Sequence, residues 1–350
     1  MPKRRRKAAS KRAVQWRLPL FSAAAFLYLA FAVYLYSRHF RKLRDLDNSL
    51  VIALTLASLG CYVLSRRWVA SFLASLLAGA VYGFGPYVLG LTRFHPTASL
   101  LAAAIPWLFC PSAFAFKKRL TRLRYPCTLL PFAAIIAFFL LCSHFRLFAV
   151  PKDACLHSRD LVGLLAPLVT AKLGGKTMLL GFYHVPVAMA VLGVILSMAA
   201  QRYALLTIPT AAIILGLSGP VLGVSPVMWF SIPTVFFSVA FGLGLQGVLL
   251  AGHRDRKWIM FVVVFAAFLS IAALLMATKY FQAWCCLATG YAKLFLEAGK
   301  IYLLAAVTMA IIFLITRLQY RAKPFRWLLL ATVTTLDIFL GASYIIDKVL

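Results

Sequence analysis

Two carboxylates stand one residue apart in the stretch RKLRDLDNSL, at Asp45 and Asp47. An Asp-x-Asp pair just outside a membrane can bind a metal ion together with a sugar phosphate, and a carboxylate can also act as a general base. Basic residues around the pair offer salt-bridge partners: Arg38, Arg41, Lys42 and Arg44. The stretch therefore has two interpretations, a catalytic pair or a short charged turn.

Further basic residues are expected on the same side of the membrane as this pair. They are Arg146, Arg159, Lys172 and Lys176. Lys and Arg side chains pair with phosphate oxygens, so this group is a candidate binding site for a lipid phosphate or pyrophosphate. The alternative is an ordinary headgroup contact, in which the long side chains extend to the membrane surface.

Two ionisable residues fall within or beside apolar stretches, Asp337 in TVTTLDIFLGASY and His184 in GFYHVPVAM. Ionisable groups inside a membrane are costly, and they are often functional. Asp337 is therefore a candidate substrate-binding residue, with a structural hydrogen bond to a neighbouring helix as the alternative. Neither residue has an obvious charge partner in the sequence, so no proton relay is predicted.

Two strings that look like nucleotide motifs lack the context that those motifs need. GLGLQG at 242–247 fits a dinucleotide-binding pattern but lies inside an apolar span instead of after a strand. Its glycines, with Ser238, are better explained as small residues that let helices approach closely. GGKT at 174–177 lacks the first glycine of a phosphate loop, since Thr170 stands there. Because the seven cysteines and six histidines show no ligand spacing, no metal site is predicted and no cofactor is identified.

Composition decides the class of protein. Of 350 residues, 63% are hydrophobic and 13% charged, with a mean hydropathy of +0.91, whereas soluble domains carry about 25% charged residues. Many stretches are apolar for about 20 residues, which is the length that crosses a bilayer. Because the runs are continuous, they predict an all-α polytopic transmembrane bundle. About eleven helices are expected, at 18–37, 50–64, 69–91, 97–116, 127–145, 177–200, 203–224, 232–252, 258–278, 301–318 and 327–345.

The charge of the chain predicts its orientation. There are 37 Lys and Arg against 8 Asp and Glu, a net charge of +29. Residues 1–17 form a basic tail whose expected partner is the anionic headgroups of the cytoplasmic leaflet, and not nucleic acid. About 23 of the basic residues fall on the side of this tail, which favours a cytoplasmic N-terminus and an outer C-terminus. Residues 18–350 are expected to form one transmembrane domain, with outer interfacial segments near 146–176 and 279–300.

The stretch LGCYVLSRRWVASFLASLLAGAVYGFGPYVLGLTRFHPTASLLAAAIPWLF, at 59–109, resembles the membrane core of bacterial YfhO-type proteins and related GT-C glycosyltransferases. Later stretches are similar to that family in the same order: RDLVGLLAPLV and GFYHVPVAMAVLGV within 159–194, SIPTVFFSVAFGLGLQGVL at 231–249 and TTLDIFLGASY at 334–344. The resemblance implies a GT-C-like helical core of reduced form. The long first outer loop of the family is shortened here to residues 38–49, and its large outer domain after the last helix is lacking.

This resemblance implies transfer of a sugar from a polyprenyl-phosphate donor at the outer face, with the catalytic acid in the first outer loop, where Asp45 and Asp47 are expected. The candidate substrate-binding residues are Arg159, Lys172, Lys176 and Asp337. A non-catalytic accessory that assists a partner subunit in envelope glycan assembly is the other form of this hypothesis. A transporter or lipid flippase that uses Asp337 or His184, and a structural subunit without chemistry, are the alternatives. The expected location is a bacterial plasma membrane.

Overall fold

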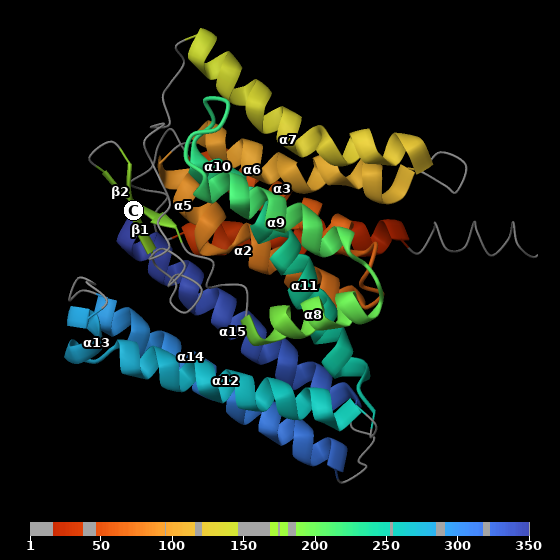
Figure 1. Ribbon diagram of the computed structural model, residues 1–350. Helices are drawn as coiled ribbons and strands as arrows, with labels where there is room; N and C mark the ends of the chain where they lie inside the picture. The colour runs from red at the N-terminus through yellow and green to blue at the C-terminus, as the bar shows by residue number, and fades with distance from the viewer. Residues whose placement is uncertain are drawn as a thin grey trace, which may run out of the picture.

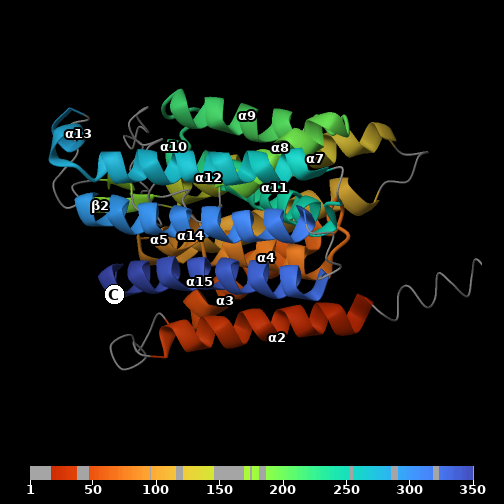
Figure 2. The same ribbon diagram turned by 90° about the horizontal axis from the view of Figure 1, so that it is seen from below.

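The computed structural model is a bundle of long apolar helices that lie roughly side by side (Figures 1 and 2). It describes residues 17–37, 47–94, 96–115, 121–145, 169–173, 176–180, 187–252, 255–284, 291–317 and 323–349. The predicted polytopic helical bundle is confirmed, and one short β-hairpin is added to it. The chain is an integral membrane protein by the length and composition of these helices.

The elements follow one another along the chain as fifteen labelled segments and a hairpin would in a meandering bundle. Those before the hairpin are α2 (Arg17–Tyr36), α3 (Asp47–Ser65), α4 (Phe72–Gly83), α5 (Pro86–Phe94), α6 (Pro96–Cys110), the π-helical η1 (Pro111–Ala115) and α7 (Thr121–His144). The hairpin consists of β1 (Val169–Leu173) and β2 (Lys176–Leu180). After it come α8 (Val187–Ala199), α9 (Ala204–Leu217), α10 (Pro226–Trp229), α11 (Ser231–Leu250), α12 (Arg256–Met276), α13 (Lys279–Trp284), α14 (Tyr291–Arg317) and α15 (Lys323–Val349).

Eight described helical segments are long and apolar enough to cross a membrane. They are Pro19–Tyr36, Phe72–Leu91, Thr97–Phe114, Pro126–His144, Pro226–Leu250, Arg256–Met276, Phe295–Thr316 and Pro324–Ser343. Three shorter apolar helices, Leu50–Ser65, Val187–Ala199 and Leu205–Leu217, occupy the places of the other predicted spans. A helix satisfies its own backbone polar groups, which is what a lipid environment requires of each segment.

Prolines interrupt the helices where the sequence indicates. α4 ends at Gly83 and α5 begins at Pro86, so the predicted break within this span is confirmed. Proline has no N–H and is tolerated at the first position of a helix, where no intrahelical partner is needed. Pro106 lies inside α6, and a π-helical turn follows at η1. Departures from regular α-helix near proline are expected, because the freed carbonyls find partners in altered turns.

Two predicted boundaries are wrong. The span expected at 177–200 begins only at Val187, because residues 176–180 form β2, paired antiparallel with β1. The pairs Leu173↔Lys176 and Val169↔Leu180 bound this register, which also replaces the helix expected to extend to residue 176. The span expected at 301–318 begins ten residues earlier, since α14 is continuous from Tyr291.

The core of the bundle surrounds α11, which packs against α8, α4 and α9. A Cβ atom on Gly193 of α8 would collide with the Ala240 carbonyl of α11, and one on Gly244 of α11 would collide with the Met189 carbonyl of α8. On another side, a Cβ on Gly242 would lie 3.0 Å from the Ala78 Cβ of α4. Small residues therefore let three helix backbones approach closely, as the glycines of this segment predicted.

The bundle has two distinct ends, and both views show them (Figures 1 and 2). The N-terminal end contains the start of α2, the turn at 66–71 and Ala251, the residue after α11. The hairpin end contains β1, β2 and α13, and α15 finishes there. The first described helix therefore starts at the end opposite to that at which the last one finishes, as the predicted orientation requires.

Candidate functional site

The first acidic pair lies at the hairpin end. Asp47 is the first residue of α3, and Asp45 lies outside the described residues. The start of a helix favours negative charge, because unpaired backbone N–H groups and the helix dipole point toward it. A carboxylate at this position therefore suits a local structural role as well as a chemical one, and both interpretations stay open.

The structure brings two of the candidate basic residues into one hairpin. Lys172 belongs to β1 and pairs with Thr177, whereas Lys176 is the first residue of β2 and pairs with Leu173. β2 packs beside α5, which is the second half of the span Phe72–Leu91. Arg146, Arg159 and His184 lie outside the described residues. Lys172 and Lys176 thus share the hairpin end with Asp47.

The scaffold beneath this hairpin is fixed by a buried tyrosine of α5. The Tyr87 hydroxyl donates to the Val227 carbonyl of α10 at 2.9 Å, and its ring is fully buried. This bond joins segments 140 residues apart in the sequence. Because a buried hydroxyl needs its partner, the bond fixes α5 against α10. The sequence indicates Tyr87 only as part of an apolar stretch, so this role was not predicted.

Asp337 lies within α15 and is buried, as is its neighbour Thr334. It interacts electrostatically with Tyr302, a buried residue of α14. The two residues are 35 positions apart along the chain, and nothing in their spacing predicts the contact. The carboxylate therefore lies between two neighbouring helices, where either a structural or a transport role would place it.

Two arginines join helix ends at the N-terminal end. Arg326, buried in the first turn of α15, donates from Nη1 to the Ala251 carbonyl at 3.0 Å. Arg256, in the first turn of α12, donates from Nη2 to the Thr316 carbonyl of α14 at 3.3 Å. The last carbonyls of a helix have no intrahelical partner, so a guanidinium there satisfies them. These roles were not predicted, although basic residues at helix ends are a signal for them.

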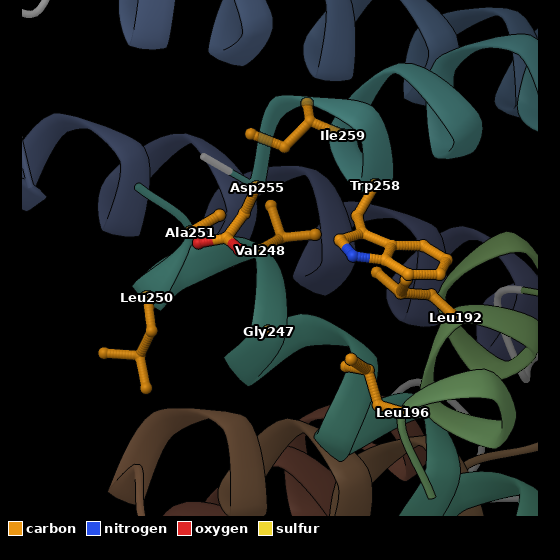
Figure 3. Close-up of a pocket in the computed structure, with 9 residues that line it drawn as sticks. All are labelled: Leu192, Leu196, Gly247, Val248, Leu250, Ala251, Asp255, Trp258 and Ile259. Carbon is orange, nitrogen blue, oxygen red and sulfur yellow. The ribbon is translucent and has the colours of Figure 1, made fainter. Parts of the chain in front are cut away.

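A pocket of about 210 Å³ opens beside this arginine pair, between α8, α11 and the start of α12 (Figure 3). Leu192 and Leu196 form one wall, and the Trp258 indole lies on the same side. Asp255 lies at the opposite wall, next to Ala251. The lining is apolar apart from the carboxylate of Asp255, the indole N–H and backbone groups.

One predicted ion pair is confirmed at the hairpin end. The Lys300 Nζ lies 3.2 Å from the Glu297 Oε1, three residues earlier on α14. Both side chains are about half exposed, so the pair contributes little to stability. Among the residues that the structure describes, no three His, Cys, Asp or Glu side chains gather as metal ligands.

Comparisons with known proteins give no relative from which a function can be transferred. No family model matches the chain. No curated protein matches it, and neither does any solved structure. Its function has to be inferred from its own residues and packing.

Proposed function

We propose that the chain is a reduced GT-C-like membrane protein that handles a polyprenyl-phosphate sugar at the hairpin end, which faces the outside of a bacterial plasma membrane. One observation carries the proposal: Asp47 and the lysine-bearing hairpin lie at the same end of the bundle. A donor of this kind combines an apolar chain, which the membrane holds, with a phosphate that basic residues bind.

The proposed chemistry uses the two kinds of charge for different steps. Asp45 or Asp47 accepts the proton of an acceptor hydroxyl, whose oxygen attacks the anomeric carbon of the donor sugar. The bond between that carbon and the phosphate oxygen breaks, and polyprenyl phosphate leaves with the electron pair. Lys172, Lys176 and Arg159 bind the phosphate, whose negative charge increases as the bond breaks.

The packing below the hairpin supports this assignment. A site that stabilises developing charge must be held in position by a rigid scaffold. β2 lies against α5, which Tyr87 fixes to α10 through the Val227 carbonyl. Residues of the hairpin are therefore carried by the most buried part of the bundle.

The test is a transfer assay in membranes that contain the full chain. The variants are Asp45→Ala, Asp47→Ala and the double substitution, with labelled polyprenyl-phosphate sugar as the donor. Loss of a general base typically costs about 10²- to 10⁴-fold in rate, so at least one variant should lose most transfer. Glu297→Gln is the matched control, because it removes another carboxylate from the hairpin end without touching the proposed site.

The outcomes separate the forms of the proposal. Unchanged transfer in both single variants and in the double variant excludes the pair as the catalytic base. No transfer by the wild type, together with retained binding of the donor that Lys172→Gln and Lys176→Gln reduce, favours the non-catalytic accessory. No donor binding at all overturns both forms.

A second candidate function, transport of a polar solute or flipping of a lipid, is favoured by a different observation. Asp337 is buried within a span and interacts with Tyr302 of the neighbouring helix. Carboxylates at such positions commonly mark ion or substrate pathways. Asp337→Asn keeps the size of the side chain and removes its charge. Loss of uptake or of lipid flipping in proteoliposomes, with sugar transfer absent in the wild type, would favour transport over transfer.

A further inference from the structure

The pocket at the N-terminal end lies at the opposite end of the bundle from the proposed transfer site (Figure 3). It is formed where α11 ends and α12 begins, with α8 as the facing wall. Its apolar lining includes Leu192, Leu196, Val248 and Ile259. Spans of a membrane protein end near the headgroup region, so a pocket at this level meets the boundary between hydrocarbon and headgroups.

The size of the pocket limits what can enter it. Its volume of about 210 Å³ is below the range of about 300–1,000 Å³ that encloses a complete drug-sized ligand. An apolar pocket of this size at a membrane boundary fits part of a lipid, namely the upper portion of one acyl chain. Leu250, which also lines the pocket, is 70% exposed, so the pocket is open toward the surroundings of the bundle.

The polar part of the lining selects a positively charged group. Asp255 is exposed, and its Oδ2 accepts a hydrogen bond from the Gly252 N–H at 2.9 Å, which positions the carboxylate at the pocket. Trp258, three residues later, lines the same pocket and is 41% exposed. A carboxylate and an indole face are the two groups that bind an ammonium ion best in proteins.

Basic side chains next to the pocket supply the opposite charge. Arg256 and Lys257 follow Asp255 directly at the start of α12, and the Lys257 side chain is exposed. Arg326 is buried against Ala251, whose residue lines the pocket, through its hydrogen bond to the carbonyl. A ligand here therefore meets a carboxylate and, beside it, groups that attract phosphate.

We propose that this pocket binds a zwitterionic aminophospholipid of the phosphatidylethanolamine class. The primary ammonium pairs with Asp255 and lies against Trp258, the phosphate lies toward Arg256 and Lys257, and one acyl chain enters between Leu192 and Leu196. A phosphatidylglycerol headgroup has no ammonium for Asp255. Phosphatidylcholine has a quaternary ammonium that cannot donate a hydrogen bond to it. The site is independent of the proposed sugar transfer.

The test measures lipid binding to the purified full chain in detergent by native mass spectrometry. Phosphatidylethanolamine, phosphatidylcholine and phosphatidylglycerol with identical acyl chains are titrated separately. One charge-assisted hydrogen bond corresponds to about a tenfold difference in affinity, so phosphatidylethanolamine should bind about tenfold more tightly than the other two. Asp255→Asn should abolish this preference. It keeps an acceptor oxygen for the Gly252 N–H, so the turn is preserved.

Two further variants separate pocket binding from general lipid contact. Leu196→Trp fills the pocket and should weaken binding of all three lipids, whereas Leu328→Trp, at a side chain 67% exposed on α15, should not. Glu297→Gln is the charge control for Asp255→Asn. If Asp255→Asn fails to fold, Trp258→Leu tests the same preference by removing the indole.

Two results would overturn the proposal. Equal or tighter binding of phosphatidylglycerol, reduced by Arg256→Gln and Lys257→Gln but not by Asp255→Asn, would identify an anionic-lipid site instead. Equal binding of all lipids by the wild type, unchanged in Leu196→Trp, would show that the pocket binds no particular lipid.

Discussion

The spans that end in α11 and α7 are both long and apolar, yet the bundle buries them to very different extents. In the span Pro226–Leu250 83% of the residues are buried, whereas in Pro126–His144 only 22% are. The span of α7 is nevertheless the more hydrophobic of the two. Hydrophobicity therefore does not decide which helix occupies the centre of this protein.

The difference lies in the size of the side chains. α11 carries Ser238, Gly242 and Gly244 on its buried surface, and these allow close contact with α4 and α8. α7 has no glycine, and large residues such as Leu129 and Leu140 are 62% and 58% exposed. Lipid tails are as apolar as leucine, so close packing and not hydrophobicity favours association of helices in a membrane.

The largest expected effect compares one leucine from each helix. Leu245→Ala, at a fully buried position of α11, should lower the free energy of unfolding by about 3 kcal/mol, because a cavity replaces packed atoms. Leu129→Ala on α7 should change it by less than about 0.5 kcal/mol. Denaturant unfolding in mixed micelles measures both. Equal losses at the two sites would contradict the assignment of α11 to the core.

The next effect tests the close approach of α8 and α11. Gly193→Ala should cost about 2 kcal/mol, because the new methyl group meets the Ala240 carbonyl and one backbone must move. Ala137→Val, at an exposed position of α7, adds more volume and should be nearly neutral. Thermal denaturation in detergent compares the two variants. An unchanged melting temperature for Gly193→Ala would show that these helices do not touch as described.

A smaller effect concerns how α11 is fixed to the turn before α4. The Gln246 Oε1 accepts hydrogen bonds from the N–H groups of Ala70 and Ser71, at 2.6 and 3.1 Å. Gln246→Ala should cost about 1 kcal/mol by removing both. Gln246→Glu keeps an acceptor oxygen and should retain most of the stability. Unfolding of the two variants under the same conditions gives the comparison, and equal losses would show that acceptance by the side chain is unimportant.

The smallest effect is expected at an exposed ion pair. Glu297→Gln removes the salt bridge to Lys300, whose side chain is 59% exposed. Solvent screens such pairs, so the change in the free energy of unfolding should stay below about 0.5 kcal/mol. A loss as large as that of Leu245→Ala would mean that this part of α14 is packed more tightly than its exposure indicates.

Much of the fold is predictable because a single helix in lipid must satisfy its own backbone. Each predicted apolar stretch corresponds to a described helix, and the breaks at Pro86 and the pair of Glu297 with Lys300 are local features. The hairpin was missed although Gly174 and Gly175, between two five-residue strands, are a recognised signal for a two-residue turn. The stretch was read instead as a helix start and an incomplete phosphate loop.

The candidate sites depended more on contacts between distant residues. The contact of Asp337 with Tyr302 and the bond from Arg326 to Ala251 join residues 35 and 75 positions apart. No local period encodes such pairs. The predicted roles of Asp45, Asp47, Lys172 and Lys176 rest on the family resemblance and stay predictions.

The sequence by itself determined that this is a membrane protein of bundled helices, since continuous apolar stretches leave the backbone no other way to satisfy its hydrogen bonds in lipid. It also determined most positions at which those helices are interrupted. Only the tertiary structure decided that α11 is central, that Asp337 meets Tyr302, and that Asp255 and Trp258 line one pocket. These depend on which small residues face each other across helices, and hydropathy along one helix does not contain that information.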